Sequence, residues 1–142
     1  MPKFLGIDYG LERTGLAMSD PEGRMAVPLR VLELSEFGSR KKQLDALADI
    51  AAAYGIEAIA LGLPLHGDGS ESGMSRQARN IGARIGRRLN LPVFLVPEFL
   101  SSFEAGKDLE GCKKRAACLD AQAACRILAS FLEQPEHARL RL

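Results

Sequence analysis

The sequence predicts a mixed α/β protein, in which helices flank a five-stranded sheet made of an antiparallel three-strand meander and two parallel strands. Three observations support this class: short apolar runs in the first third of the chain, a change to helical spacing of apolar residues after them, and two later runs that are apolar throughout. The 142 residues are 46% hydrophobic and 26% charged, which is typical of a globular protein. We therefore expect a single domain over residues 1–142.

The first three strands are expected at Lys3 to Tyr9, Thr14 to Ser19 and Met25 to Leu34. Their short connections, rich in Gly, Asp and Pro, favour antiparallel pairing. Pro28 has no amide proton to donate, so the third strand belongs at an edge of the sheet. The first strand is then central, between the second strand and a parallel neighbour.

Helices and strands alternate in the remainder of the chain, which implies right-handed parallel crossovers. A first helix is expected to end at Tyr54, with Gly55 as its cap. Two strands are expected from Ala58 to Leu63 and from Val93 to Val96, with a second helix between them from Ser72 to Leu89. A short helical piece from Ser101 and a last helix from Lys114 to Glu133 follow. Met74 is expected on the buried stripe of the second helix. Residues 135–142 are expected to form a frayed tail.

The charge balance and hydropathy exclude several classes. Nineteen Lys and Arg against eighteen Asp and Glu give a net charge of +1, so total charge indicates neither a nucleic-acid nor a membrane partner. No segment approaches the roughly 20 apolar residues of a membrane span, and the N-terminus has no signal-peptide pattern. Three cysteines without paired spacing are expected to stay reduced. We expect a cytoplasmic protein.

Three carboxylates stand where an apolar core would be expected. Asp8 ends the first strand, Glu98 follows the last strand, and Asp120 lies inside the apolar stripe of the last helix. Each alone fits an ordinary turn, loop or surface residue, but the fold would bring all three to one end of the sheet. Carboxylates at close range raise one another's pKa unless cations neutralise them. This pattern predicts two Mg²⁺ or Mn²⁺ ions and catalysis of phosphodiester hydrolysis by the three acids.

The segment from Gly6 to Asp20, GIDYGLERTGLAMSD, closely resembles the opening motif of the bacterial pre-16S ribosomal RNA nuclease family. That family is also described as Holliday-junction-resolvase-like, within the ribonuclease H-like superfamily. Later segments are similar to its other motifs in the same order, namely Gly62 to Leu65 with Asp68 to Glu71, Glu98 to Ala105, and Leu119 to Leu128. The resemblance covers nearly the whole chain. It implies a ribonuclease H-like fold, maturation of the 5′ end of 16S rRNA in ribosome biogenesis, and metal-dependent cleavage by acids corresponding to Asp8, Glu98 and Asp120.

The chain departs from the family pattern at two places. The family's third motif usually begins Asp-Glu-Arg, whereas this chain has Pro97, Glu98 and Phe99. Its second motif usually carries Asn where this chain has His66, which is either an auxiliary proton carrier or a surface loop residue. These departures leave a weakly active or inactive RNA-binding or regulatory module as an alternative to a nuclease.

The second helix is the main candidate for phosphate contact. It carries five arginines and no acid, and Arg76, Arg79 and Arg87 fall within about one face. A solvated polar face is the alternative. Further candidates for nucleic-acid contact are Arg13, Ser70 in the glycine-rich loop before the helix, and Ser101 and Ser102, which otherwise serve as turn and cap residues.

Two other functions compete with rRNA processing. Resolution of branched DNA, as a Holliday junction resolvase, would need a symmetric dimer, so both a monomer and a homodimer stay open. The Asp8-x-Gly10 pattern with Gly15 also looks like the phosphate loop of actin-like and sugar kinases, but those need two domains, and 142 residues are too few. We therefore expect no nucleotide cofactor, and RNA rather than branched DNA as the partner.

Overall fold

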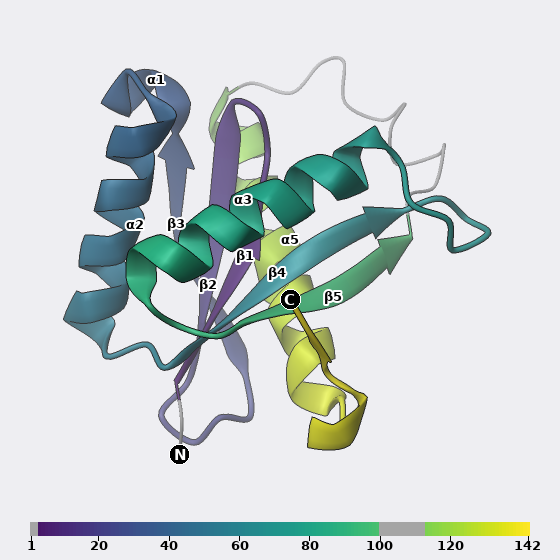
Figure 1. Ribbon diagram of the computed structural model, residues 1–142. Helices are drawn as coiled ribbons and strands as arrows, with labels where there is room; N and C mark the ends of the chain where they lie inside the picture. Colours follow the sequence, from purple (N-terminus) through teal and green to yellow (C-terminus); the bar gives the residue numbers. More distant parts are fainter. Residues whose placement is uncertain (1–2, 100–112) are drawn as a thin grey trace.

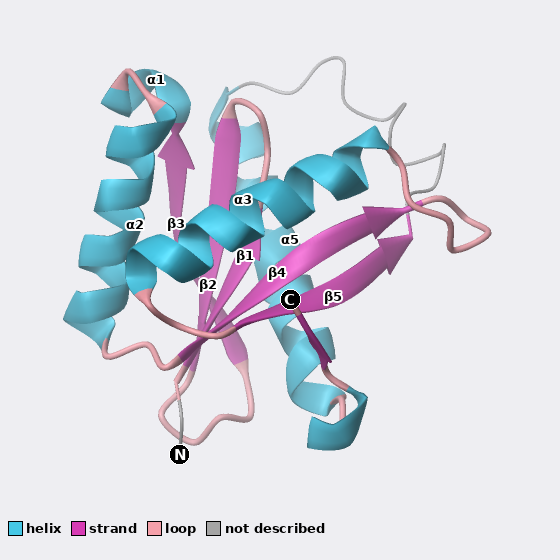
Figure 2. Ribbon diagram, viewed as in Figure 1, coloured by secondary structure: helices cyan, strands magenta, loops and turns pink. Residues whose placement is uncertain are grey.

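The computed structural model of the protein describes residues 3–99 and 113–142. Its core is a six-stranded mixed sheet in the order β3-β2-β1-β4-β5-β6, with helices on both faces (Figures 1 and 2). The strands are β1 (Phe4–Asp8), β2 (Arg13–Ser19), β3 (Ala26–Glu33), β4 (Ala58–Leu65), β5 (Val93–Phe99) and β6 (Leu140–Arg141). The helices are α1 (Leu34–Phe37), α2 (Arg40–Tyr54), α3 (Gly73–Leu89) and α5 (Lys113–Glu133), with a 3-10 turn η1 (Glu136–Ala138).

The strand pairing confirms the predicted meander and the predicted parallel half. β1 pairs antiparallel with β2 and parallel with β4, β2 pairs antiparallel with β3, and β4 pairs parallel with β5. β1 is therefore an inner strand, and β3, which contains Pro28, is an edge strand as expected. No helix in the described part of the chain is long and apolar enough to cross a membrane.

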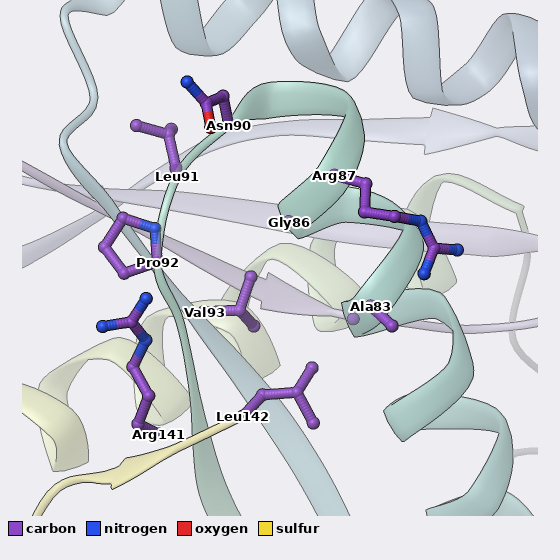
Figure 3. A pocket seen from close by; sticks show the side chains of 10 residues that line it. Ala83, Gly86, Arg87, Asn90, Leu91, Pro92, Val93, Arg141 and Leu142 are labelled. Carbon is purple, nitrogen blue, oxygen red and sulfur yellow. The ribbon is translucent and has the colours of Figure 1, made fainter.

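The expectation of a frayed tail is wrong, and it accounts for the difference between five strands and six. Leu140 and Arg141 pair antiparallel with Leu95 and Phe94 of β5, and the backbone N–H of Leu142 donates to the carbonyl oxygen of Val93 at 2.9 Å (Figure 3). The Arg141 guanidinium also lies over the Phe94 ring. A two-residue strand leaves no periodic pattern in the sequence, so its position depends on these contacts with β5.

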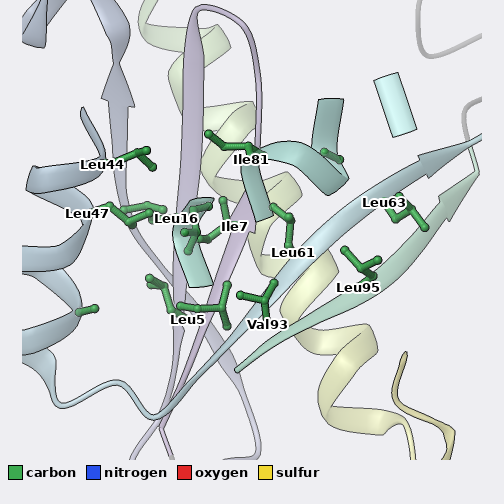
Figure 4. Packing of buried hydrophobic residues seen from close by; sticks show 14 of the residues in the cluster. Leu5, Ile7, Leu16, Leu44, Leu47, Leu61, Leu63, Ile81, Val93 and Leu95 are labelled. Atoms are coloured by element: carbon green, nitrogen blue, oxygen red, sulfur yellow. The ribbon is translucent and has the colours of Figure 1, made fainter. Parts of the chain in front are cut away.

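The two faces of the sheet carry separate apolar clusters because side chains alternate along each strand. Leu5 and Ile7 of β1 pack on the side covered by α2 and α3, where Ile81 of α3 is also buried (Figure 4). The opposite side is covered by α5, which buries Ile127 and Phe131 against the sheet. β4 is buried on both sides, as its unbroken apolar run predicts.

The first turn of α3 corrects one expected core position. Met74 is 50% exposed, whereas Ser75 is fully buried. The Ser75 hydroxyl donates to the carbonyl oxygen of Pro64, and Ser72 and Ser75 form a reciprocal cap at the start of the helix. Burial at this end of α3 therefore follows the capping geometry instead of the apolar stripe.

Substitution of Gly6 by Ala should destabilise the fold. A Cβ at residue 6 would lie 2.7 Å from Cβ of Leu128 and 2.9 Å from the backbone oxygen of Ala124, so α5 would have to move. We expect Gly6→Ala to lower the free energy of unfolding by about 1–3 kcal/mol or more in denaturant titrations. Gly67→Ala is the matched control, because a Cβ there meets no atom within 4 Å. Equal stability of the two variants would contradict the close approach of α5.

Candidate functional site

Asp8 lies at the carboxyl end of β1, on the side of the sheet that faces α5. Phe4 and Gly6, which share this side by strand alternation, contact Phe131 and Leu128 of α5. Asp8 pairs with Gly15 of β2. On its other side, the last pair between β1 and β4 is Ile7 with Leu61, so Asp8 lies next to Gly62 of β4. The carboxylate is thus surrounded by two strands and a helix at an inner position of the sheet.

Glu98 reaches the same side of the sheet from β5. Phe94 and Val96, four and two residues earlier, pack toward α5, so alternation directs Glu98 to that side as well. A Cβ built on Gly62 would be 3.2 Å from Oε2 of Glu98. The absence of a side chain at residue 62 therefore leaves room for the Glu98 carboxylate over the strand that adjoins Asp8.

Asp120 is brought to this region by the packing of α5 on β2. A Cβ on Gly15 would lie only 2.1 Å from the backbone oxygen of Asp120, so only glycine lets the helix approach this closely. Because Gly15 is the partner of Asp8 in the sheet, the two aspartates become neighbours although 112 positions separate them in the sequence.

The charge of Asp120 contributes to the environment of Asp8. The pKa of Asp8 is raised from 3.8 to about 6, first by burial of the carboxyl group and second by the negative charge of Asp120. The positive charge of Arg126 on α5 opposes this rise and lowers the pKa. An ionised Asp8 is therefore held in an unfavourable environment, and an added positive charge would relieve it.

Arg13 lies beside Asp120. Its Nε donates to Oδ2 of Asp120 at 3.1 Å, and the two side chains are only about one-third exposed (29% and 30%). The sequence predicts Arg13 as a contact for a substrate phosphate, and the structure places it beside Asp120, one of the three predicted catalytic acids. The ion pair with Asp120 restricts the orientation of the guanidinium.

The three acids supply only carboxylate oxygens, which are the ligands that Mg²⁺ and Mn²⁺ prefer. No group of three acidic, histidine or cysteine side chains within residues 3–99 and 113–142 is close enough to form a ready-made ion site. The raised pKa of Asp8 and its closeness to Asp120 nevertheless fit a cation, since burial and like charge both favour neutralisation there. The donor set fits a divalent ion chemically, and the number of ions stays a prediction.

The predicted loop contacts lie in the segment between β4 and α3. Oδ1 of Asp68 accepts from both the backbone N–H and the hydroxyl of Ser70, at 2.9 and 2.6 Å, so the donors proposed for a phosphate are used inside the loop. The hydrogen bond from the Ser70 hydroxyl has the larger effect and the one from its backbone N–H the smaller, and both lower the pKa of Asp68. His66 is exposed just after β4. Ser101 and Ser102 lie outside the described residues.

The arginines of α3 differ in their partners. Arg79 forms a two-pronged ion pair with Glu71, and Arg88 pairs with Asp45 of α2 at 2.9 Å. Arg76 and Arg87 are exposed. Glu71 and Asp45, which pair with two of the five arginines, lie outside α3. The charge pattern of α3 alone therefore does not predict these ion pairs.

Arg126 is a residue that the sequence reasoning missed. It lies on the outer part of α5, it is exposed, and its charge acts on Asp8. One signal was available, namely that Arg126 follows Asp120 by six residues on the same helix, but that spacing does not place the two on one face. Only the packing of α5 on the sheet shows that its charge reaches Asp8.

The order of the strands and the helices on both faces of the sheet define a ribonuclease H-like fold. The structure of RuvC from Thermus thermophilus matches over 99% of both chains with a TM-score of 0.59 at 16% identity, and RuvC from the same organism in complex with a Holliday junction substrate matches with a TM-score of 0.57. These likenesses show the fold and confirm the predicted class, with one more strand than expected.

The chain belongs to the RuvX family, whose description reads "Holliday junction resolvase" and whose sequence model matches residues 2–134. Curated relatives include a protein of Oleidesulfovibrio alaskensis, 45% identical over 99% of this chain and 98% of its own length. Others are found in Nitratidesulfovibrio vulgaris, at 47% identity over 96% and 97%, and in Lawsonia intracellularis, at 38% over 99% of each chain. Each bears the name "Putative pre-16S rRNA nuclease", which confirms the resemblance found in the sequence.

The raised pKa of Asp8 predicts a specific dependence of stability on pH. Because the folded state binds the Asp8 proton more tightly than the unfolded chain does, this contribution favours folding in acid and is lost as pH rises from about 4 through about 6. With a chelator present, Asp8→Asn should therefore be more stable than wild type at pH 7, by on the order of 1–3 kcal/mol in denaturant titrations.

The control for this experiment is Asp49→Asn, at an exposed position of α2. It should leave the pH profile unchanged. Added Mg²⁺ or Mn²⁺ should stabilise the wild type more than Asp8→Asn. An Asp8→Asn variant that is no more stable than wild type at pH 7 would contradict the conclusion that the ionised Asp8 carboxylate destabilises the fold.

Proposed function

We propose that this protein is a metal-dependent nuclease that hydrolyses phosphodiester bonds at Asp8, Glu98 and Asp120. The observation that carries the proposal is the contact between α5 and β2, which holds Asp120 against Asp8 at the carboxyl edge of a ribonuclease H-like sheet. Two partly buried acids that repel each other are costly to a fold, so their juxtaposition favours a functional role. Membership of the RuvX family supports the same activity.

Each part of the site has a defined task in this reaction. Mg²⁺ or Mn²⁺ ions, when bound, supply the positive charge that stabilises the attacking and leaving oxygens of the phosphodiester. Asp8, Glu98 and Asp120 would hold the ions. Arg13, directed by Asp120, would orient the scissile phosphate through its guanidinium. The positive charge of Arg126 favours the ionised form of Asp8, which is the form that binds a cation.

The substrate is proposed to be the 5′ region of pre-16S rRNA. The named curated relatives, at 38–47% identity over nearly the full chain, are called pre-16S rRNA nucleases. On this proposal the protein works in the cytoplasm and uses neither a membrane nor a nucleotide cofactor. Branched DNA is the second candidate, because the family description names a Holliday junction resolvase and the RuvC structure contains such a junction. A resolvase would act as a homodimer, whereas an RNA nuclease can act as a monomer.

The departures from the family's third motif leave Glu98 in place. Pro97 and Phe99 are exposed, and strand alternation directs them to the side opposite Glu98. β5 remains paired with β4 through this segment, whereas β6 pairs only with Phe94 and Leu95. The missing N–H of Pro97 therefore falls on the edge of β5 that faces away from β4, beyond the residues that pair with β6. This geometry favours an active nuclease over an inactive binding module.

Cleavage assays test the proposal directly. With Mg²⁺ or Mn²⁺, the protein should shorten a 5′-extended 16S precursor, and Asp8→Asn, Glu98→Gln and Asp120→Asn should each lower the rate by roughly 100-fold or more, because each removes an ion ligand. RNA affinity should change far less. Asp49→Asn should cleave like wild type. An Asp8→Asn variant of undiminished activity would refute the site, and binding without cleavage at any metal concentration would favour the RNA-binding module.

Arg13 should matter through its planar fork as well as its charge. Arg13→Lys keeps the charge but cannot make the same paired hydrogen bonds to a phosphate, so kcat/KM should fall roughly 10-fold or more. Because the Arg13–Asp120 pair is partly exposed, the loss of stability in thermal melts should stay within about 1 kcal/mol. Arg30→Lys, at the sheet edge, serves as the control. Full activity of Arg13→Lys would rule out the phosphate-orienting role.

A further inference from the structure

A basic surface covers α2 and α3 on the side of the sheet opposite α5. A hollow of about 300 Å³ between the two helices is lined by basic residues of both, together with Leu44 and Asp45. A second hollow of about 560 Å³ lies on the other side of α3, between this helix and β6 (Figure 3). Arg87 lines both hollows. We call the set of basic residues that line the hollow between the two helices the α2–α3 basic surface, and it consists of Lys41, Arg84, Arg87 and Arg88.

The composition of this surface fits phosphate groups. Four basic side chains line the hollow together with one acid, Asp45, whose carboxylate is paired with Arg88. Arg84 and Arg87 are exposed, at helical spacing on one face of α3. Leu44, the apolar residue of the α2–α3 hollow, is 6% exposed, so that hollow lacks the apolar centre that protein partners bury. A row of phosphates is the ligand that such a charge pattern binds best.

The sheet separates this surface from the carboxylates. α2 and α3 bury Leu44, Leu47 and Ile81 in the cluster on one face, whereas Asp8 and Glu98 lie on the face covered by α5. One short stretch of nucleic acid cannot contact both faces of the sheet at once. Any phosphates at the α2–α3 basic surface therefore belong to a different segment from the one at the acids.

We propose that the α2–α3 basic surface binds the phosphate backbone of a second segment of the same RNA whose cleavage site lies at Asp8, Glu98 and Asp120. This inference rests on the proposed function and extends it to how the substrate is anchored. It differs from the arginine face predicted from the sequence, because Arg79 is paired with Glu71, whereas Lys41 comes from α2. The substrate that fits is a folded RNA with two segments that can reach opposite faces of the protein.

The test compares two double variants that remove the same charge. Arg84→Gln with Arg87→Gln removes two exposed arginines of the surface, and Arg24→Gln with Arg30→Gln removes two arginines from the β2–β3 hairpin. Binding of precursor rRNA is measured across a salt series in the Asp8→Asn background, which prevents cleavage. The surface variant should bind on the order of 10- to 50-fold more weakly near 0.1 M salt, and its slope of log affinity against log salt should shrink by about 1.4 to 1.8. The hairpin variant should retain nearly full affinity, and thermal melts check that both variants fold.

A second readout separates this inference from the proposed function. In the otherwise wild-type enzyme, the surface variant should cleave a short RNA that spans only the cleavage site at the normal rate and the long precursor more slowly. Unchanged affinity and slope for the precursor, or equal losses in both double variants, would overturn the anchoring surface. If the wild type cleaves no RNA but the surface variant alone loses affinity, the nuclease proposal fails and the binding surface stands.

Discussion

The close approach of α5 to the sheet is the constraint on which the candidate site depends. At Gly6, Gly15 and Gly62, a Cβ would come within 2.1 to 2.7 Å of atoms of this helix. The helix can lie this close to a strand only where the strand residue has no side chain. They bring the backbone of Asp120 onto β2 and leave space for Glu98 over β4. The glycines of the family motifs therefore have a packing role that places the acids.

The same packing creates an electrostatic cost that the fold itself relieves only in part. Burial and the charge of Asp120 raise the pKa of Asp8 to about 6, while Arg126 lowers it and Arg13 pairs with Asp120. A protein selected only for stability would not keep two such acids together. In the proposed function, the remaining negative charge would attract divalent ions, so the feature that destabilises the metal-free fold would be the one that suits it to phosphodiester chemistry.

The sequence predicted most of the architecture because periodicity and turn residues are local signals. It predicted the meander, the helices α2, α3 and α5, and the inner position of Asp8, since an acid at the end of an apolar run and another within a helical stripe are visible without a structure. It missed features that depend on distant partners. β6 is too short to show a hydrophobic period, and its position depends on pairing with β5. At the start of α3, the capping residue Ser75 is buried and Met74 is exposed. Glu71 and Asp45 form ion pairs with arginines of α3 from outside that helix.

The near-zero net charge of the chain therefore conceals two surfaces of opposite character, with acids on the α5 side and a basic surface over α2 and α3. The account depends most directly on whether the three acids bind divalent ions together. A crystal of the protein soaked in Mn²⁺ and recorded at the manganese absorption edge measures this. The account predicts two anomalous peaks about 3.5 to 4 Å apart, bridged by oxygens of Asp8, Glu98 and Asp120. Saturating Mn²⁺ with no peak at these carboxylates would contradict it.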